Sequence, residues 1–178
     1  RSLAAAAREV SALAIEQGPV QGPVLLTPVQ QWFFAEDIPT RQHWNQSLLL
    51  TPRQPVDVTA LAGALQALVA QHDALRLRFV ERGEGWEQTH APSATVELWQ
   101  RQAASVEELR EHCDLAQASL DLEHGPLMRA LLVDMADGSQ RLLLVLHHLV
   151  VDGVSWRVLL EDLQRGYGQG VAGQPLTT

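Results

Sequence analysis

The sequence predicts an α+β fold, of mixed α/β character, in which helices flank a mixed sheet. The first observation is a hairpin signal: Asp137-Gly138, a preferred two-residue turn, joins apolar segments at residues 127–135 and 141–149. The second is a set of segments with the apolar spacing of helices: 58–70, 105–119 and 156 to about 165. Because hairpins and helices alternate along one chain, a single sheet covered by helices accounts for both.

Four of the predicted helices begin at or just after a residue whose side chain can accept a hydrogen bond from the first turn. The expected caps are Thr27, Asp57, Ser105 and Ser155. Glu108 stands three residues after the third of these, which is the spacing of a capping box. The last helix is expected to lose its regular structure after about Arg165, because glycines follow it: Gly166, Gly168, Gly170 and Gly173.

Further strands are predicted from alternating or short apolar segments. Residues 74–80 alternate apolar side chains with Arg76 and Arg78, which is the period of a half-buried strand. The two arginines form either a solvated strand face or buried support for a loop. Segment 142–146 is almost wholly apolar, so we expect it at the centre of the sheet. Shorter strands are expected at residues 47–51, 86–89 and 96–99.

The chain is predicted to have two parts. Residues 1–23 are expected to form an amino-terminal helix and a linker, because Gly18-Pro19 and Gly22-Pro23 interrupt the chain after an alanine-rich helical segment. Residues 24–178 are expected to form the folded unit. No apolar run approaches the roughly 20 residues of a membrane span, so a cytoplasmic protein without a membrane partner is the expectation.

The composition excludes several classes of function. The net charge is −8 over 178 residues, which argues against a nucleic-acid partner, since that needs a basic surface. All 13 basic residues are arginine, so neither a lysine Schiff base nor a Walker A loop is possible. Cys113 is the single cysteine, which excludes an internal disulfide and a thiolate metal cluster. We expect it to be a small buried or half-buried side chain.

The most informative segment is His147-His148, at the end of the apolar strand, followed by Asp152-Gly153. Two imidazoles there are costly unless they are hydrogen-bonded or used. Adjacent strand residues face opposite ways, so we expect different roles for the histidines and no shared metal. Asp152 is expected to hold the loop or orient a histidine, and Gly153 to permit a tight turn or a close approach to a ligand. The helix beginning near Ser155 points its positive end toward this turn. The spacing leaves both a structural and a catalytic role open.

Three segments together resemble a known family. Residues 147–156 resemble HHxxxDGxSW, the signature of condensation-type domains of nonribosomal peptide synthetases, which belong to the chloramphenicol-acetyltransferase-like superfamily. Residues 71–79 are similar to the RHExLRTxF segment of that family, and residues 28–33 resemble PIQxWF, the opening motif of epimerization domains. Ordinary condensation domains open with a motif closer to SxAQxRLW, which the chain lacks. The chain is therefore identified as the amino-terminal lobe of an epimerization domain, with a condensation domain and a non-catalytic docking module as alternatives.

The resemblance assigns roles to individual residues. It implies that His148, the second histidine, is catalytic. It implies that His147 and Asp152 are structural, Asp152 through an ion pair with an arginine, for which Arg76 and Arg78 are candidates because they lie close to the motifs in sequence. The other supporting residues are Gly153, Ser155 and Trp156. Trp156 is expected to pack its helix against the sheet. The aromatic side chains expected to pack in the core or between lobes are Trp32, Phe33 and Phe34.

The resemblance also implies an activity and its partners. Two lobes enclose a tunnel, into which a peptidyl carrier domain inserts an aminoacyl or peptidyl thioester on its phosphopantetheine arm. The implied reaction inverts the α-carbon from L to D, a step of antibiotic and other secondary-metabolite synthesis. The chain itself is expected to bind no metal and no cofactor. Family domains are more than twice as long, so the second lobe is absent and the isolated lobe is expected to be inactive.

Overall fold

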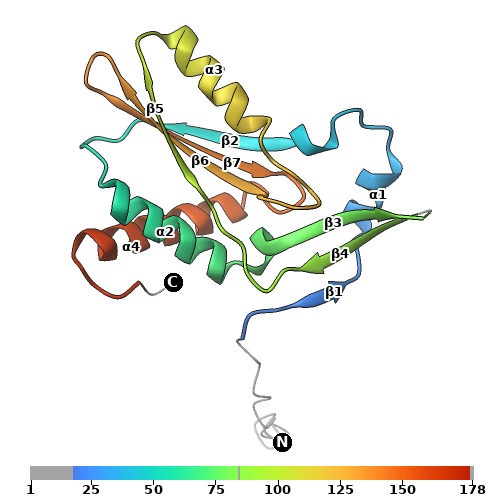
Figure 1. Cartoon of the computed structure of the whole chain (residues 1–178). Coiled ribbons are helices and arrows are strands. Elements are labelled where there is room, and N and C mark those ends of the chain that lie inside the picture. The colour runs from blue at the N-terminus through green and yellow to red at the C-terminus, as the bar shows by residue number, and fades with distance from the viewer. Residues whose placement is uncertain (1–17, 84, 177–178) are drawn as a thin grey trace, which may run out of the picture.

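The computed structural model describes residues 18–83 and 85–176, and it contains two sheets where the sequence predicts one (Figure 1). The mixed α/β class is confirmed. The elements in chain order are β1 (Gly22–Val24), α1 (Pro28–Ala35), the 3₁₀ helix η2 (Arg41–His43), β2 (Asn45–Leu50), α2 (Val58–Gln71), the 3₁₀ helix η3 (Asp73–Arg76), β3 (Leu77–Arg82), β4 (Gly85–His90), β5 (Leu98–Ala103), α3 (Val106–Gln117), β6 (Met128–Met135), β7 (Gln140–His147) and α4 (Ser155–Val171).

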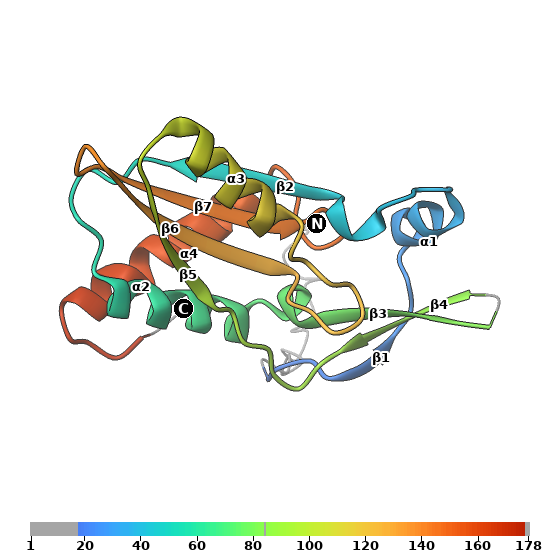
Figure 2. The same ribbon diagram turned by 45° about the horizontal axis from the view of Figure 1, so that its top comes forward.

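The larger sheet has the strand order β2-β7-β6-β5 and carries most of the core. Strand β7 lies between β2 and β6 and is antiparallel to both, whereas β5 is parallel to β6. Residues 142–146 are at most 7 % exposed, which confirms the predicted central strand. Helices α2 and α4 cover one face of this sheet and α3 covers the other, so apolar side chains of β7 are buried on both sides (Figures 1 and 2).

Helix α4 continues six residues beyond Arg165, to Val171, so the prediction of a flexible glycine-rich end is wrong. Two of its glycines face α2. A Cβ at Gly166 would lie 3.3 Å from the Cβ of Ala64, and one at Gly170 would lie 3.1 Å from the Cβ of Ala60. The close packing of the two helices therefore offsets the poor helix propensity of glycine.

The smaller sheet, β1-β4-β3, packs against α1. The ring of Phe34 stacks on Trp86 with centroids 4.2 Å apart and also contacts Phe79. Phe33 and Phe34 are buried as expected, but Trp32 is 58 % exposed. Pro23, which the sequence assigns to a linker, lies in β1 opposite Thr89 of β4. The predicted helix at residues 2–17 lies outside the described residues.

Several boundaries differ from the sequence prediction. Residues 73–76 form a 3₁₀ helix, so the strand expected from residue 74 begins at Leu77. Arg76 explains this turn, because its guanidinium donates to the carbonyls of Val69 and Ala70 at the end of α2 and pairs with Asp73. The strand expected at residues 96–99 is β5, which begins and ends later.

Three of the expected helix caps are confirmed. The side chains of Thr27, Asp57 and Ser105 each accept a hydrogen bond from the backbone three residues on. The reciprocal bond of the capping box is shifted by one residue, because the Glu108 side chain accepts from the N–H of Ala104 and not from that of Ser105. Cys113 is half-buried, as predicted, and burial raises the pKa of its thiol.

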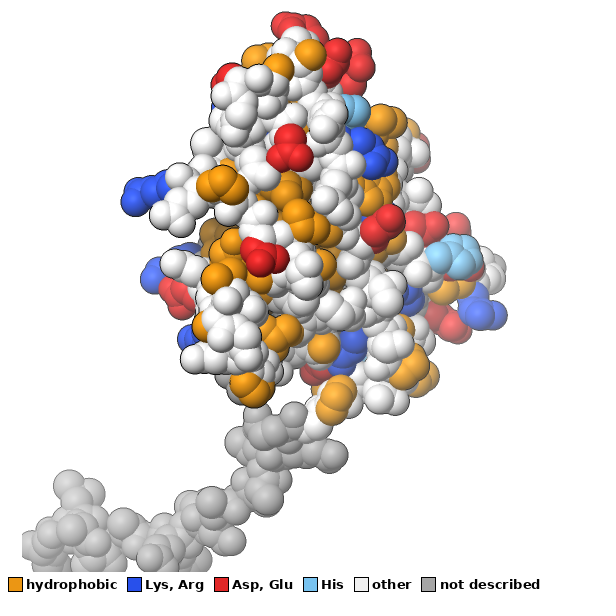
Figure 3. Space-filling view, turned by 60° about the vertical axis from the view of Figure 1, so that its left-hand side comes forward, with side chains coloured by type: hydrophobic (Ala, Val, Ile, Leu, Met, Phe, Trp, Pro, Cys, Tyr) orange, Lys and Arg blue, Asp and Glu red, His pale blue; other side chains and the backbone are white. Residues whose placement is uncertain are grey.

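An apolar groove of about 450 Å³ lies at one end of the larger sheet, where apolar side chains gather in Figure 3. Leu50 lines it, and this residue pairs with Leu142 at the end of β7 opposite the histidines. The groove is therefore remote from the histidine motif. Within the part of the chain that the structure describes, no helix has the length and apolar character needed to cross a membrane.

Candidate functional site

The histidine motif lies where β7 ends. The strand stops at His147, so His148 begins the turn and the expectation that both histidines lie in one strand is wrong. Strand β2 starts beside this turn, because Asn45 pairs with His147. The N–H of His148 donates to the carbonyl of Trp44 at 2.8 Å. The motif is therefore held by the antiparallel register of β2 as well as by its own loop.

His147 is completely buried. Its Nδ1 accepts from the N–H of Leu149 at 3.2 Å, so Nε2 carries the proton and donates to the carbonyl of Arg41 at 2.8 Å. The ring also meets Phe33 edge-on, with centroids 5.9 Å apart. Burial lowers the pKa of His147 to about 4, and the Arg41 carbonyl only partly opposes this. His147 is thus a neutral residue whose two ring nitrogens bind the backbone.

His148 has the opposite setting. Its side chain is exposed, and its Nδ1 lies 2.9 Å from the carbonyl of Val151. A carbonyl only accepts, so Nδ1 carries the proton. Nε2 is then the acceptor, and it receives the side-chain amide N–H of Gln46 at 3.2 Å. The imidazole is thus held by one backbone bond and one side-chain bond, and the Nε2 lone pair that accepts from Gln46 is the one that can take a proton.

Gln46 is the site residue that the sequence reasoning missed. It lies on β2 opposite Leu146, and its Oε1 accepts from the indole N–H of Trp156 at 2.8 Å. Trp156 is 9 % exposed and packs α4 against the sheet, as expected. Gln46 lies outside all three of the family-like segments, 28–33, 71–79 and 147–156. Only the pairing of β2 with β7 brings it to His148, and sequence patterns do not specify strand partners.

Asp152 is exposed and lies just before α4, whose N-cap residue is Val154. Its Oδ1 accepts from the N–H groups of Val154 and Ser155 at 3.0 and 2.7 Å, and from the hydroxyl of Ser155 at 2.7 Å. The bond from the backbone of Ser155 is the largest cause that holds the pKa of Asp152 below its usual range. Ser155 is the first residue of the helix and not its cap, which corrects the prediction. Because Asp152 occupies these N–H groups, they are not free to bind another anion.

The expected ion pair of Asp152 is absent among the described residues, where no arginine lies within 4.0 Å of its carboxylate. Arg76 is 2 % exposed and is bound at the end of α2. Arg78 donates to the carbonyl of Leu77 and packs on Gly125, where a Cβ would lie 2.5 Å from the guanidinium carbon. Both arginines support loops elsewhere in the lobe.

Gly153 is exposed and does not have a positive φ. Apart from its two chain neighbours, no residue of the described chain has an atom within 4 Å of a Cβ built on it. The packing of this lobe therefore does not require glycine, and the tight-turn interpretation is not supported. The open space beside Gly153 leaves room for another molecule or another part of the protein.

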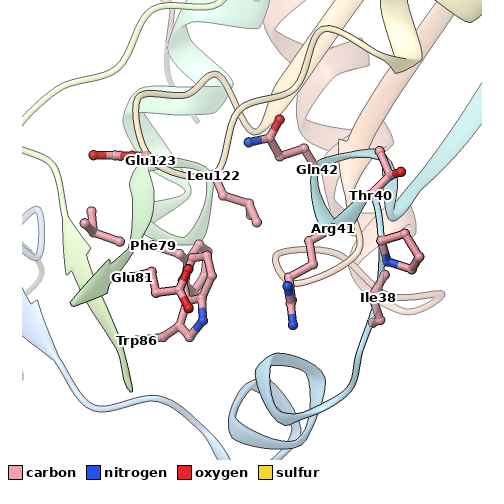
Figure 4. A pocket seen from close by; sticks show the side chains of 11 residues that line it. Ile38, Thr40, Arg41, Gln42, Phe79, Glu81, Trp86, Leu122 and Glu123 are labelled. Carbon is pink, nitrogen blue, oxygen red and sulfur yellow. The ribbon is translucent and has the colours of Figure 1, made fainter. Parts of the chain in front are cut away.

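A pocket of about 420 Å³ is lined in part by Arg41, the residue whose carbonyl binds His147 (Figure 4). Arg41 uses its carbonyl to bind His147 and directs its side chain into this pocket, opposite Trp86. Its guanidinium donates to the carbonyl of Glu36 at 2.7 Å. His148 does not line the pocket. Among the described residues, no group of three or more His, Cys, Asp or Glu side chains is arranged to hold a metal ion.

Comparisons with known proteins identify the family of this chain. A family model described as "Condensation domain" matches residues 20–178. The chain is 47 % identical over 175 residues to a linear gramicidin synthase protein of Brevibacillus parabrevis, covering 93 % of this chain and 2 % of that protein. It is 44 % identical over 161 residues to surfactin synthase subunit 1 of Bacillus subtilis (strain 168), covering 86 % of this chain and 4 % of that protein.

Two solved structures are similar. The epimerization domain from the third module of tyrocidine synthetase B superposes with a TM-score of 0.87 at 36 % identity, over 92 % of this chain and 39 % of that one. The first condensation domain of the calcium-dependent antibiotic synthetase gives 0.75 at 24 % identity, over 88 % and 40 %. The second likeness shows the fold alone. The chain thus spans well under half the length of either structure.

Proposed function

Since the chain belongs to the condensation domain family of nonribosomal peptide synthetases, we propose that it is the amino-terminal lobe of an epimerization domain. The observation that carries this choice is the likeness to a solved epimerization domain, at 36 % identity with a TM-score of 0.87. The PIQxWF-like opening at residues 28–33 supports the same choice. The structure explains part of this motif, because its last residue, Phe33, is buried in the core between α1 and the smaller sheet.

The proposed substrate is an aminoacyl or peptidyl thioester on the phosphopantetheine arm of a peptidyl carrier domain. The arm belongs to the carrier and is not a cofactor of this chain. The second lobe of the same domain completes the tunnel. The exposed surface around His148 and Gly153 is where the thioester is expected to enter, because both residues face away from the core.

The proposed reaction exchanges one proton at the α-carbon. The thioester carbonyl acidifies the α-hydrogen, a base removes it to give an enolate-like intermediate, and a proton returns on the opposite face. Nε2 of His148 has the lone pair needed for one of these transfers, since Nδ1 is bound to Val151. General acid–base catalysis of this kind contributes roughly 10²–10⁴-fold. The partner for the other face is expected from the second lobe.

A condensation domain is the second candidate, and the family description favours it. There His148 would assist an amine that attacks a thioester, and the products are a new amide and a free carrier thiol. Mass analysis of a carrier-loaded thioester in D₂O separates the two reactions. Epimerization predicts uptake of one deuterium at the α-carbon with no change in chain length. Extension of the acyl chain without such uptake would overturn the proposal.

A further inference from the structure

The indole of Trp156, the amide of Gln46 and the imidazole of His148 form a chain of hydrogen bonds with one permitted direction. The indole N–H only donates, so the amide oxygen of Gln46 must face Trp156. The amide nitrogen is then the group that faces His148, and it donates to Nε2. At the far end the carbonyl of Val151 only accepts, so Nδ1 must carry the proton. A donor-only group and an acceptor-only group thus fix the polarity of every link.

We propose that Gln46 is a positioning residue that, together with Trp156, holds the His148 imidazole with a proton on Nδ1 and the lone pair of Nε2 toward the amide N–H of Gln46. Its use in catalysis rests on the proposed function, whereas the tautomer itself depends on the hydrogen bonds of this lobe. Trp156 acts on His148 only through Gln46, since its indole N–H is bound to that side chain.

The two bonds of Gln46 differ in length. The bond from the indole N–H of Trp156 to the amide oxygen is 2.8 Å, and the bond from the amide N–H to Nε2 of His148 is 3.2 Å. Trp156 is buried, and the backbone of Gln46 is paired within the sheet. The amide is therefore anchored on rigid elements, and its link to Nε2 is the one that a substrate can replace.

Protonation of His148 breaks the chain of hydrogen bonds. When Nε2 takes the α-proton, two donors face each other, the amide N–H of Gln46 and the new N–H of the ring. Rotating the amide would present its oxygen to His148, but its N–H groups would then oppose the indole N–H of Trp156. Neither orientation satisfies both neighbours, and an unmade bond in a partly buried site is unfavourable. This chain of hydrogen bonds, from Trp156 through Gln46 to His148, therefore favours return of the proton from Nε2 to the substrate carbon.

The test is ¹⁵N NMR of histidine-labelled protein, in the complete domain, at neutral pH. His148 is expected as the Nδ1–H tautomer. Gln46→Met removes the amide and Trp156→Phe removes the donor that orients it. In both variants only the Val151 carbonyl still selects Nδ1–H, so the share of the Nε2–H tautomer is expected to rise above that of the unaltered domain. The Trp156→Phe result is decisive, because that indole N–H binds Gln46 and not His148. An unchanged His148 tautomer in both variants would overturn the proposal.

Gln46→Glu sharpens the test. A carboxylate accepts from both Trp156 and Nε2–H, so His148 is expected to carry protons on both nitrogens. Gln42→Glu adds the same charge at an exposed position of η2 and is expected to leave the tautomer unchanged. If the two glutamates change the protonation of His148 equally, the effect comes from added negative charge and not from the hydrogen bonds of Gln46. That result would contradict the proposal.

Isotope exchange at the substrate α-carbon tests whether the hydrogen bonds of Gln46 contribute to catalysis. Gln46→Met is expected to slow it by about 10-fold, the effect of losing one hydrogen bond. The NMR and exchange results can fail separately. The domain could show the Nδ1–H tautomer of His148 and yet extend its substrate without exchange at the α-carbon. That result would contradict the proposed function but not the proposed role of Gln46. Exchange at the α-carbon together with a mixture of His148 tautomers in the unaltered domain would support the proposed function and contradict the proposed role of Gln46.

Discussion

His147 and His148 are neighbours in the chain but lie in opposite environments. His147 is completely buried, and its two ring nitrogens are bound by backbone groups of Arg41 and Leu149. His148 is exposed, with one nitrogen bound by the backbone of Val151 and the other by a side chain. Backbone partners within folded segments cannot leave without local unfolding, whereas a side-chain partner can be displaced by a substrate. The type of partner, and not the presence of an imidazole, therefore separates a structural histidine from a reactive one.

The largest expected effect on stability comes from His147→Ala. This change leaves the carbonyl of Arg41 and the N–H of Leu149 without partners and opens a cavity beside Phe33. We expect the free energy of unfolding to fall by about 3–5 kcal/mol. Denaturant titration measures it, with His148→Ala as the matched control, expected to cost at most about 0.5 kcal/mol because the side chain is exposed. Equal losses in the two variants would remove the distinction between the histidines.

The pH dependence of stability is the second way to sharpen the comparison. The pKa of His147 is lowered in the folded state to about 4, from 6.5 in the unfolded chain. Between these values the unfolded chain binds a proton that the folded chain does not, so stability falls as the pH falls. The contribution is complete above pH 6.5 and is lost by pH 4, a total of about 3 kcal/mol. His147→Gln is expected to lack this part of the slope in denaturant titrations at several pH values. An identical slope in both proteins would refute the assignment.

Asp152 provides the smallest effect. It is exposed and accepts from N–H groups at the amino end of α4, so Asp152→Ala is expected to lower the thermal midpoint by only a few degrees. Asp152→Asn retains an acceptor and is expected to lie close to the unaltered protein. Because the pKa of Asp152 is lowered, its contribution is present at neutral pH and is lost as the pH falls through the folded-state value. Loss of folding in Asp152→Ala would instead indicate a buried partner supplied by the rest of the domain.

Local patterns predict much of this lobe. Segment 142–146 is apolar without interruption, and it is the central strand. The caps at Asp57 and Ser105 could be predicted because their side chains accept hydrogen bonds from backbone N–H groups only three residues on, in the first turn of the helix. The position of the histidine motif at the end of that strand follows from the same local signals. These features depend on residues that are near one another in the chain.

Features set by distant contacts could not be predicted. Gln46 reaches His148 only because β2 pairs with β7, and 102 residues separate the two in sequence. Gly166 extends a helix against its own propensity because Ala64 of another helix packs on it. Arg76 turns the chain where the alternating pattern predicts a strand, since it binds carbonyls at the end of α2. In each case a tertiary contact overrides the local preference.

The most direct measurement of the central claim is solvent deuterium uptake at the α-carbon of an aminoacyl thioester on its carrier domain. The complete domain is expected to incorporate deuterium, and His148→Ala is expected to reduce the rate by about 10²-fold or more. The isolated lobe, residues 1–178, is expected to remain at background, because it supplies a proton-transfer group for one face of the carbon only. Rapid uptake by the His148→Ala domain or by the isolated lobe would contradict the assignment of His148 as one member of a two-lobe acid–base pair.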